Sequence, residues 1–367
     1  MNANQREGTM NVAPNDPITL AFPRTHPPQN AEIAGRPWQS LWVWSVDSYG
    51  NQANDAFTEV RVELVHPLGT LLRGSERAWR LQNGEANLGP LQSDLATTIN
   101  MQICALNREW ECLQHQLTIQ PAATADFDIQ APSRVTAGEA FDVRVIARDR
   151  FGNQDPSYEG PIIFKTPRDA MSDNRQETMM VGGESLFTNI VLRTALSYQT
   201  LQVTDLPEDP PFPDTGVRNE KLIEVLPAAP VTLVFLVQPP DIVIAGQRLE
   251  PALVVSLLDE FGNVASLADQ QAEVAISLLN RSGEPDLRFT EVRKTSNLGT
   301  SEFENVYIPW TGLDYWLRAS AQLSQGPAAE DSSRFEVKAG RAHGFEWVSV
   351  VPPLPPSPRA GDPWVTL

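Results

Sequence analysis

Hydrophobic and polar residues alternate along most of this chain, in short runs separated by turn-forming residues. The run LWVWSV at 41–46 is typical, and it stops at Asp47 with the sequence DSYGN. Alternation with a period of two is typical of a β-strand with one buried face. We find no amphipathic run long enough for a long helix. The pattern therefore predicts an all-β protein.

The turn that ends this strand occurs three times at domain-sized spacing, always as Asp-x-aromatic-Gly-Asn. Its Gly tolerates a positive φ, and its Asp or Asn can hydrogen-bond to the local backbone. We expect the aromatic residue to plug the end of the core, and no ligand is needed to explain the turn. The motif residues are Asp47, Gly50 and Asn51, then Asp149, Gly152 and Asn153, and finally Asp259, Gly262 and Asn263.

A second shared signal precedes each turn. An Ala-Gly pair, with its glycine at Gly35, Gly138 and Gly246, follows an aromatic strand and a proline. Further alternating runs come after each turn. Together they predict six strands and a short seventh in roughly 105 residues, the size of an immunoglobulin-like antiparallel sandwich. Local periodicity does not fix the strand order.

The repeats predict an extended array of tandem sandwiches. The expected segments are an N-terminal tail at 1–16, sandwiches at 17–121, 122–228 and 229–339, and the start of a truncated fourth repeat at 340–367. The last segment restates a repeat opening, because AGDPW resembles AGRPW. We therefore expect the chain to be a fragment of a longer array. The linkers QPAATA and LPAAPV are short, which favours restricted bending.

Two stretches carry a resemblance to a known family. VTAGEAFDVRVIARDRFGN, followed by YEGPIIF, and LVFLVQPPDIVIAGQRLEPALVVSLLDEFGN resemble the Ig-like repeats of large bacterial surface and secreted proteins. These are the invasin, adhesin and filamin-like tandem sandwiches. The first repeat fits more loosely, since it has a Trp-rich second strand and cysteines. The resemblance implies a stalk, spacer or adhesive array and brings no catalytic residues.

The charge of the chain limits its partners. A net charge of −18 over 367 residues argues against nucleic acid, whose binding depends on Lys and Arg, and against anionic membrane surfaces. No apolar run approaches the roughly 20 residues of a transmembrane helix. No signal peptide is visible, which taken literally indicates a cytoplasmic protein. Because the last segment looks like a cut repeat, we expect instead a leader and an anchor outside this fragment and a location outside the cell or at its surface.

Cys104 and Cys112 are the only cysteines. They flank ALNREWE between two consecutive strands, so a disulfide that staples a hairpin is favoured, and it would fit an oxidising compartment. The alternative is two free, half-buried thiols. No CxxC motif or histidine cluster accompanies them, which argues against a zinc site.

The tryptophans are the one feature suited to binding a sugar or a peptide. Alternation places Leu41 and Val43 on the buried face of their strand and puts Trp42 and Trp44 on the other face. Adjacent exposed Trp rings form a platform that stacks on sugars or anchors an interface. The alternative is that a loop or a neighbouring repeat covers them. Trp38 and Trp364 are expected in cores.

Other candidate chemistry is sparse, so we predict no enzyme, cofactor or metal site. The four histidines are scattered, and no catalytic or phosphate-binding motif is present. The acidic loop DLPEDPPFPDTG at 205–216 lacks the ligand spacing of an EF-hand. The predicted function is a structural spacer or adhesive stalk segment, with a carbohydrate-binding module as the alternative. Its expected partners are neighbouring repeats, with a surface glycan or protein as a further candidate.

Overall fold

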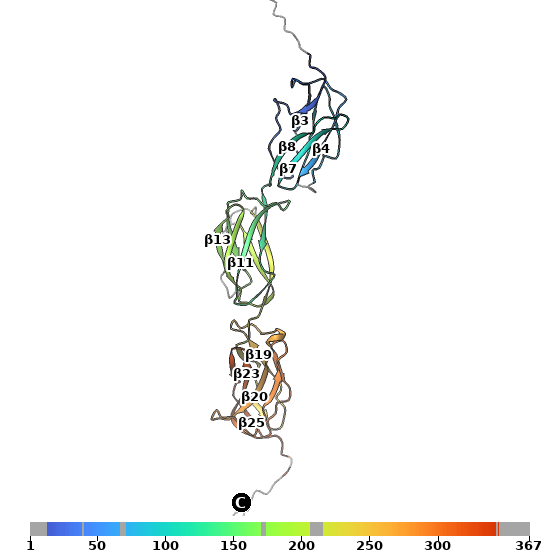
Figure 1. Cartoon of the computed structure of the whole chain (residues 1–367). Coiled ribbons are helices and arrows are strands. Elements are labelled where there is room, and N and C mark those ends of the chain that lie inside the picture. The colour runs from blue at the N-terminus through green and yellow to red at the C-terminus, as the bar shows by residue number, and fades with distance from the viewer. Residues whose placement is uncertain are drawn as a thin grey trace, which may run out of the picture. The chain divides into compact units, whose positions relative to one another are not determined.

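The computed structural model describes residues 13–38, 40–66, 71–169, 174–205, 216–342 and 344 (Figure 1). Strands dominate these residues, and the helical structure among them is one short 3-10 turn, η1, at Ala268–Gln270. The predicted all-β class is confirmed. The chain separates into two compact units, Met1–Val225 and Leu226–Leu367. The division into tandem domains, and their extended arrangement, stay predictions.

The first unit begins with two facing sheets, which we call the first sheet pair. Its two layers share one hydrophobic core, in which Val43 of one sheet and Val60 and Ile103 of the other have no exposed surface. The smaller sheet has the order β1(Thr19–Ala21), β3(Trp42–Val46), β6(Glu85–Asn87). The larger has the order β2(Ala31–Ile33), β8(Leu113–Gln120), β7(Thr98–Ala105), β4(Glu59–His66), β5(Trp79–Arg80).

The second sheet pair completes this unit and repeats the two-layer plan. Phe164 and Phe187 come from opposite sheets and meet in the core with ring centroids 5.1 Å apart. The smaller sheet has the order β14(Glu184–Val191), β11(Ala140–Asp149), β9(Thr124–Gln130). The larger has the order β10(Arg134–Thr136), β16(Arg218–Leu226), β15(Leu196–Thr204), β12(Pro161–Lys165), β13(Gln176–Met179).

The second unit holds the third sheet pair. Val255 of its smaller sheet and Leu317 of its larger sheet are fully buried in a common core. The smaller sheet has the order β17(Thr232–Val237), β19(Leu253–Leu258), β22(Thr300–Phe303). The larger has the order β18(Ile242–Ile244), β25(Phe335–Lys338), β23(Gly312–Leu323), β20(Glu273–Leu279), β21(Val292–Thr295), and β24(Gly326–Asp331) pairs with β23.

Short parallel strands interrupt the antiparallel plan in the described parts of the first and third sheet pairs. β2 pairs with β8 in parallel, and β18 pairs with β25 in parallel. Each of these strands follows prolines that end the first strand, because proline lacks the N–H that a sheet ladder needs. The chain then crosses to the other sheet and runs along its last strand. With three residues each, such strands are too short to show a periodicity, so the described residues contain more strands than the sequence predicted.

Candidate functional site

The Asp-x-aromatic-Gly-Asn turn is the most elaborately bonded feature that the repeats share. In the second sheet pair, Asp149 Oδ1 accepts the backbone N–H groups of Phe151 and Asn153, both at 2.9 Å. Its Oδ2 accepts the side-chain amide of Asn153, also at 2.9 Å. Gly152 takes a φ of +86° at the corner, a conformation that suits glycine. One buried carboxylate therefore holds the whole turn.

The other two turns use the same bonds. Asp47 accepts the backbone N–H groups of Tyr49 and Asn51, and the side chain of Asn51, at 2.9, 2.9 and 3.2 Å. Asp259 accepts the equivalent groups of Phe261 and Asn263 at 2.9, 2.8 and 2.8 Å. The turn predicted from sequence thus forms the same local structure at all three positions.

Each turn also holds the segment that leads into its own sheet pair. The Asp Oδ2 atom accepts one more backbone N–H, from Ala122 at Asp149 and from Ala228 at Asp259, both at 2.9 Å. At Asp47 the donor is Asn15, at 3.1 Å. A carboxylate bound in this way fixes the course of the chain where it enters a sandwich.

Sequence reasoning missed these linker contacts, although a signal was present. Every donor follows a proline, namely Pro14, Pro121 or Pro227, and both linkers read Pro-Ala-Ala. Proline restricts the preceding backbone and cannot donate itself. The first free N–H after it is therefore the group that the turn captures.

Hydrogen bonding also sets the ionisation of Asp47. Burial alone would raise the pKa of its carboxyl group, but bonds from Asn51, Asn15 and Tyr49 outweigh that effect and lower the pKa from 3.8 to about 2. Bonds donated to the charged form stabilise it over the neutral form. The carboxylate therefore stays charged, and keeps its bonds, well into acid.

Within the first unit, the Asp149 turn also contacts the preceding sheet pair. The ring of Phe151 packs against the core of the first sheet pair and lies over Gly35. A Cβ atom built on Gly35 would sit 2.1 Å from Phe151 Cζ. Only a glycine leaves room for the ring at this distance. Gly35 belongs to the Ala-Gly signal, so the two shared motifs meet at this joint.

Asn153 adds two polar contacts to the joint. Its Nδ2 group donates to the carbonyl oxygen of Asp94 at 2.8 Å, and its Oδ1 atom accepts the N–H of Ala96 at 2.9 Å. An amide side chain has both donor and acceptor capacity, and here it satisfies a backbone group of each kind. In all three turns the Asn side chain also donates to the turn carboxylate, which a second Asp could not do, and this explains why the motif ends in Asn.

The expectation that the aromatic residue plugs the end of the core needs correction. Tyr49 is 80 % exposed, and Phe151 packs against the core of the preceding sheet pair. The ring of Phe151 therefore serves the preceding sheet pair, and the ring of Tyr49 stays exposed.

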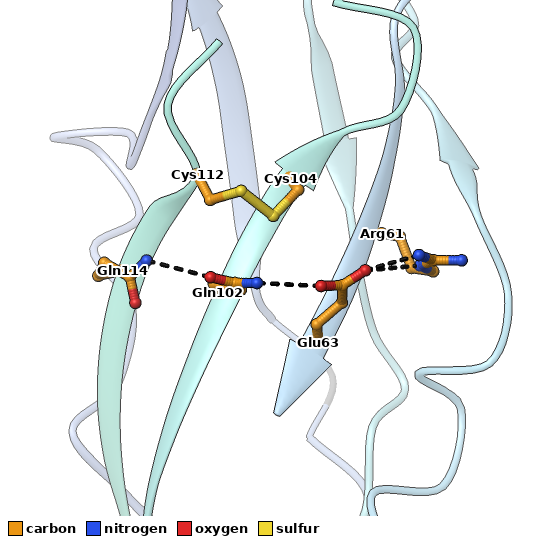
Figure 2. The surroundings of a disulfide bond; sticks show 6 residues. All are labelled: Arg61, Glu63, Gln102, Cys104, Cys112 and Gln114. Atoms are coloured by element: carbon orange, nitrogen blue, oxygen red, sulfur yellow. Dashed lines mark hydrogen bonds and ion pairs between the residues drawn. A yellow bond between two sulfur atoms is a disulfide. The ribbon is translucent and has the colours of Figure 1, made fainter. Parts of the chain in front are cut away.

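The predicted disulfide is confirmed. Cys104, near the end of β7, is bonded to Cys112, just before β8, with Cα atoms 4.4 Å apart. Figure 2 shows a row of polar side chains beside it, across β8, β7 and β4. Gln114 donates to Gln102 at 3.4 Å, Gln102 to Glu63 at 3.0 Å, and Arg61 to Glu63 at 2.6 Å. This outer face is a bonded polar surface.

Trp42 and Trp44 lie on the less buried face of β3, as the alternation predicts. Both rings are half-buried, whereas Val43 between them has no exposed surface. Trp44 Nε1 donates to Glu85 Oε2 at 3.2 Å, and the His26 ring lies 6.1 Å from the Trp42 ring. The rings therefore keep part of their faces open, and their role as a binding platform stays a prediction.

A hollow of about 430 Å³ in the third sheet pair was not predicted. Tyr307, Trp310 and Arg288 line it. Two of its side chains bond within the protein: Arg288 pairs with Asp286 at 2.6 Å, and Trp310 Nε1 donates to Tyr315 Oη at 3.1 Å.

Only some of the remaining sequence features lie within the described residues. Within the described ranges, no three His, Cys, Asp or Glu side chains gather as metal ligands would. In those same ranges, no helix has the length and apolar character needed to cross a membrane. The acidic loop lies outside the described residues from 206 to 215, and so does most of the expected fourth repeat, with Trp364.

No protein-family model matches this chain. No curated protein matches it either.

Solved structures resemble it only distantly. The Escherichia coli adhesin FdeC is 12 % identical, covers 90 % of this chain and 100 % of its own, and has a TM-score of 0.34. The FN1–FN3 domains of chicken CNTN1 are 11 % identical, with coverages of 88 % and 99 % and a TM-score of 0.28. A putative membrane anchored protein from Corynebacterium diphtheriae is 12 % identical, with coverages of 88 % and 91 % and a TM-score of 0.25. At these scores, our conclusions rest on the strands and contacts of the chain itself.

Proposed function

We propose that this chain is a non-catalytic spacer or adhesive stalk segment of a surface or secreted protein. The observation that carries the proposal is the joint in the first unit, where Phe151 covers Gly35 and Asn153 bonds to Asp94 and Ala96. A spacer must resist bending between its domains. The repeated turn supplies the contacts that do so.

Three kinds of contact act together at this joint. The Asp149 carboxylate fixes the linker, the Phe151 ring buries apolar surface, and Asn153 bridges two backbone groups. Each hydrogen bond contributes only about 1 kcal/mol, with more for a charged acceptor. Linked domains are otherwise expected to move relative to one another. Joining several weak contacts across a short linker is therefore what limits bending.

The disulfide supports a location outside the reducing cytosol. Disulfides form and persist mainly in oxidising compartments, and Cys104–Cys112 closes a short hairpin in the first sheet pair. The sequence resemblance to bacterial surface repeats points the same way. The partners proposed for this segment are neighbouring repeats, and at its adhesive surface a glycan or a protein.

Small-angle X-ray scattering of the whole chain tests the spacer proposal. A compact single domain of this length would have a radius of gyration of about 21 Å. A spacer should give a value well above this, unchanged between low and moderate salt. A radius near 21 Å would contradict the proposal, because a globule cannot separate the two ends of the chain.

A carbohydrate-binding module is the second candidate. The observation that favours it is the pair of half-buried rings of Trp42 and Trp44, one of which is oriented by Glu85. Aromatic faces in fixed positions stack on sugar rings at low entropic cost. This role is compatible with a stalk, since only one face of one sheet pair would take part.

A further inference from the structure

The joint in the first unit has two halves, and each half has a counterpart elsewhere in the protein. One counterpart lies in the first unit and the other in the second. The joint consists of a turn, Asp149–Asn153, and of the receiving end of the first sheet pair, which includes Gly35. The turn half recurs at Asp47–Asn51 in the first sheet pair. The receiving half recurs around Gly246 in the third sheet pair. We call these surfaces the free turn and the free end.

The free end reproduces the backbone of the occupied one. Gly246 donates its N–H to Ile308 O at 2.9 Å, as Gly35 donates to Ser93 O at 2.8 Å. Their φ values are +80° and +73°. The next residues, Gln247 and Arg36, close the same small turn, and the preceding alanines bond to the last strand at 2.8 Å in both cases.

This equivalence identifies the groups that would receive an Asn side chain. Asp94 and Ala96 follow Ser93 by one and three residues, so their counterparts are Pro309 and Thr311, which follow Ile308 in the same way. Both are exposed. Pro309 offers a carbonyl oxygen and Thr311 an N–H, the pair of groups that Asn153 binds in the first unit.

Exposure differs between the occupied and the free surfaces. A Cβ atom on Gly35 would meet Phe151, whereas one on Gly246 would meet no described atom within 4 Å. Tyr49 of the free turn is 80 % exposed, and Asn51 is exposed as well. Each free surface therefore has the shape that its counterpart uses in the joint, with an aromatic ring on one side and a bare glycine on the other.

We infer that the free turn of one molecule docks on the free end of a second copy, with Tyr49 over Gly246 and Asn51 bonded to Pro309 O and Thr311 N–H. The occupant is identified by the joint that the chain already makes. Such a contact is head-to-tail, so it links molecules into chains or rings rather than into dimers that share one self-complementary patch. It rests on the joint and goes beyond the spacer role, which a single molecule can fulfil.

The contact should be weak between separate molecules. Within the chain, a short linker supplies an effective concentration in the millimolar range, and separate copies lack that help. Their net charge of −18 also makes them repel each other at low salt. The association is therefore best tested at high protein concentration, in about 0.3 M salt.

Photo-crosslinking provides the test. p-Benzoylphenylalanine is placed at position 49, and isotope-labelled and unlabelled chains are mixed so that mass spectrometry separates links between copies from links within one. We expect links between copies to residues 244–249 and 307–311. The same probe at Tyr198, which is 65 % exposed on the second sheet pair, should give no such link.

Matched variants decide the outcome. Gly246→Asn keeps the left-handed backbone, which Asn tolerates, but fills the space for the Tyr49 ring, and should lower the yield about tenfold. Gly182→Asn is the control, since Gly182 has a φ of +61° and open surroundings. Absence of links between copies, or links unaffected by Gly246→Asn, would overturn the inference. A reciprocal probe at Gln247 captured only by the chain's own tail would overturn it as well.

Discussion

The ring of Phe151 occupies the space that a side chain at Gly35 would fill. The second sheet pair therefore packs against the first at a residue that has no side chain. A Cβ atom on Gly35 would be 2.1 Å from Phe151 Cζ, far inside van der Waals contact. Phe151 belongs to the Asp-x-aromatic-Gly-Asn turn and Gly35 to the Ala-Gly pair, and each motif occurs three times in the sequence for local reasons of turn geometry. Besides adopting a positive φ, Gly35 therefore leaves room for the Phe151 ring.

Gly35→Asn should therefore destabilise the joint through Phe151. Asn accepts a positive φ better than most residues, so most of the cost is collision, about 1–3 kcal/mol as in an overpacked core. The cost should largely vanish in a Phe151→Ala background. Urea unfolding of the four proteins of this cycle measures the coupling. Gly50→Asn, with open surroundings at a φ of +81°, reports the backbone strain alone.

The loss of stability of the first sheet pair in acid should follow the protonation of Asp47. Its pKa is about 2 in the folded state against 3.8 without the structure. A lowered pKa gives stability that is present above about pH 4 and is lost as the pH falls through about 2. Melting temperature measured from pH 5 to 2 should show this loss, and Asp47→Asn should flatten it. A wild-type profile with the same slope as the variant would contradict the assignment.

Reduction of Cys104–Cys112 should destabilise the first sheet pair alone. The bond closes a loop with a sequence separation of 8, for which chain entropy gives roughly 2–3 kcal/mol. In a domain of this size that corresponds to a fall in melting temperature of roughly 10 °C or more. Differential scanning calorimetry with and without reductant measures it. Transitions that all shift together would show that the loss is not confined to the cysteine-containing part.

If the tryptophan platform binds sugars, a glycan array should detect wild-type protein and lose the signal with Trp42→Ala/Trp44→Ala. Stacking on two open rings is the physical reason. Trp79→Ala is a suitable control, because that ring packs against the core of the same sheet pair. Equal binding by the wild type and the double variant would exclude the platform, and a wild type that binds no glycan would remove this second candidate function.

The sequence was sufficient for the features that depend on local chemistry. Alternation identified the β-strands, and the repeated DSYGN, DRFGN and DEFGN stretches identified the turn. Cys104 and Cys112 were correctly paired because seven residues between two strands suit a hairpin staple. Trp42 and Trp44 were assigned to the less buried face because Leu41 and Val43 occupy the other.

What the sequence did not reveal depends on contacts between segments. The parallel pairing of Ala31–Ile33 with the last strand leaves no trace in three residues. The direction of Phe151 towards the preceding sheet pair is set by Gly35, which lies over one hundred positions earlier. The linker bonds to Asp149 and Asp259 had a visible signal in Pro-Ala-Ala, yet nothing local shows that an N–H will reach a carboxylate in a later turn.

The central claim is that the turn holds neighbouring sandwiches in a fixed relation, and a distance distribution across the first joint tests it most directly. Spin labels are attached through unnatural amino acids at Glu59 and Thr188, exposed positions on the first and second sheet pairs, so that the disulfide stays intact. Double electron–electron resonance should give a narrow distribution in the wild type and a broad one in Phe151→Ala/Asn153→Ala, while Tyr198→Ala stays narrow. A wild type as broad as the double variant would contradict the claim.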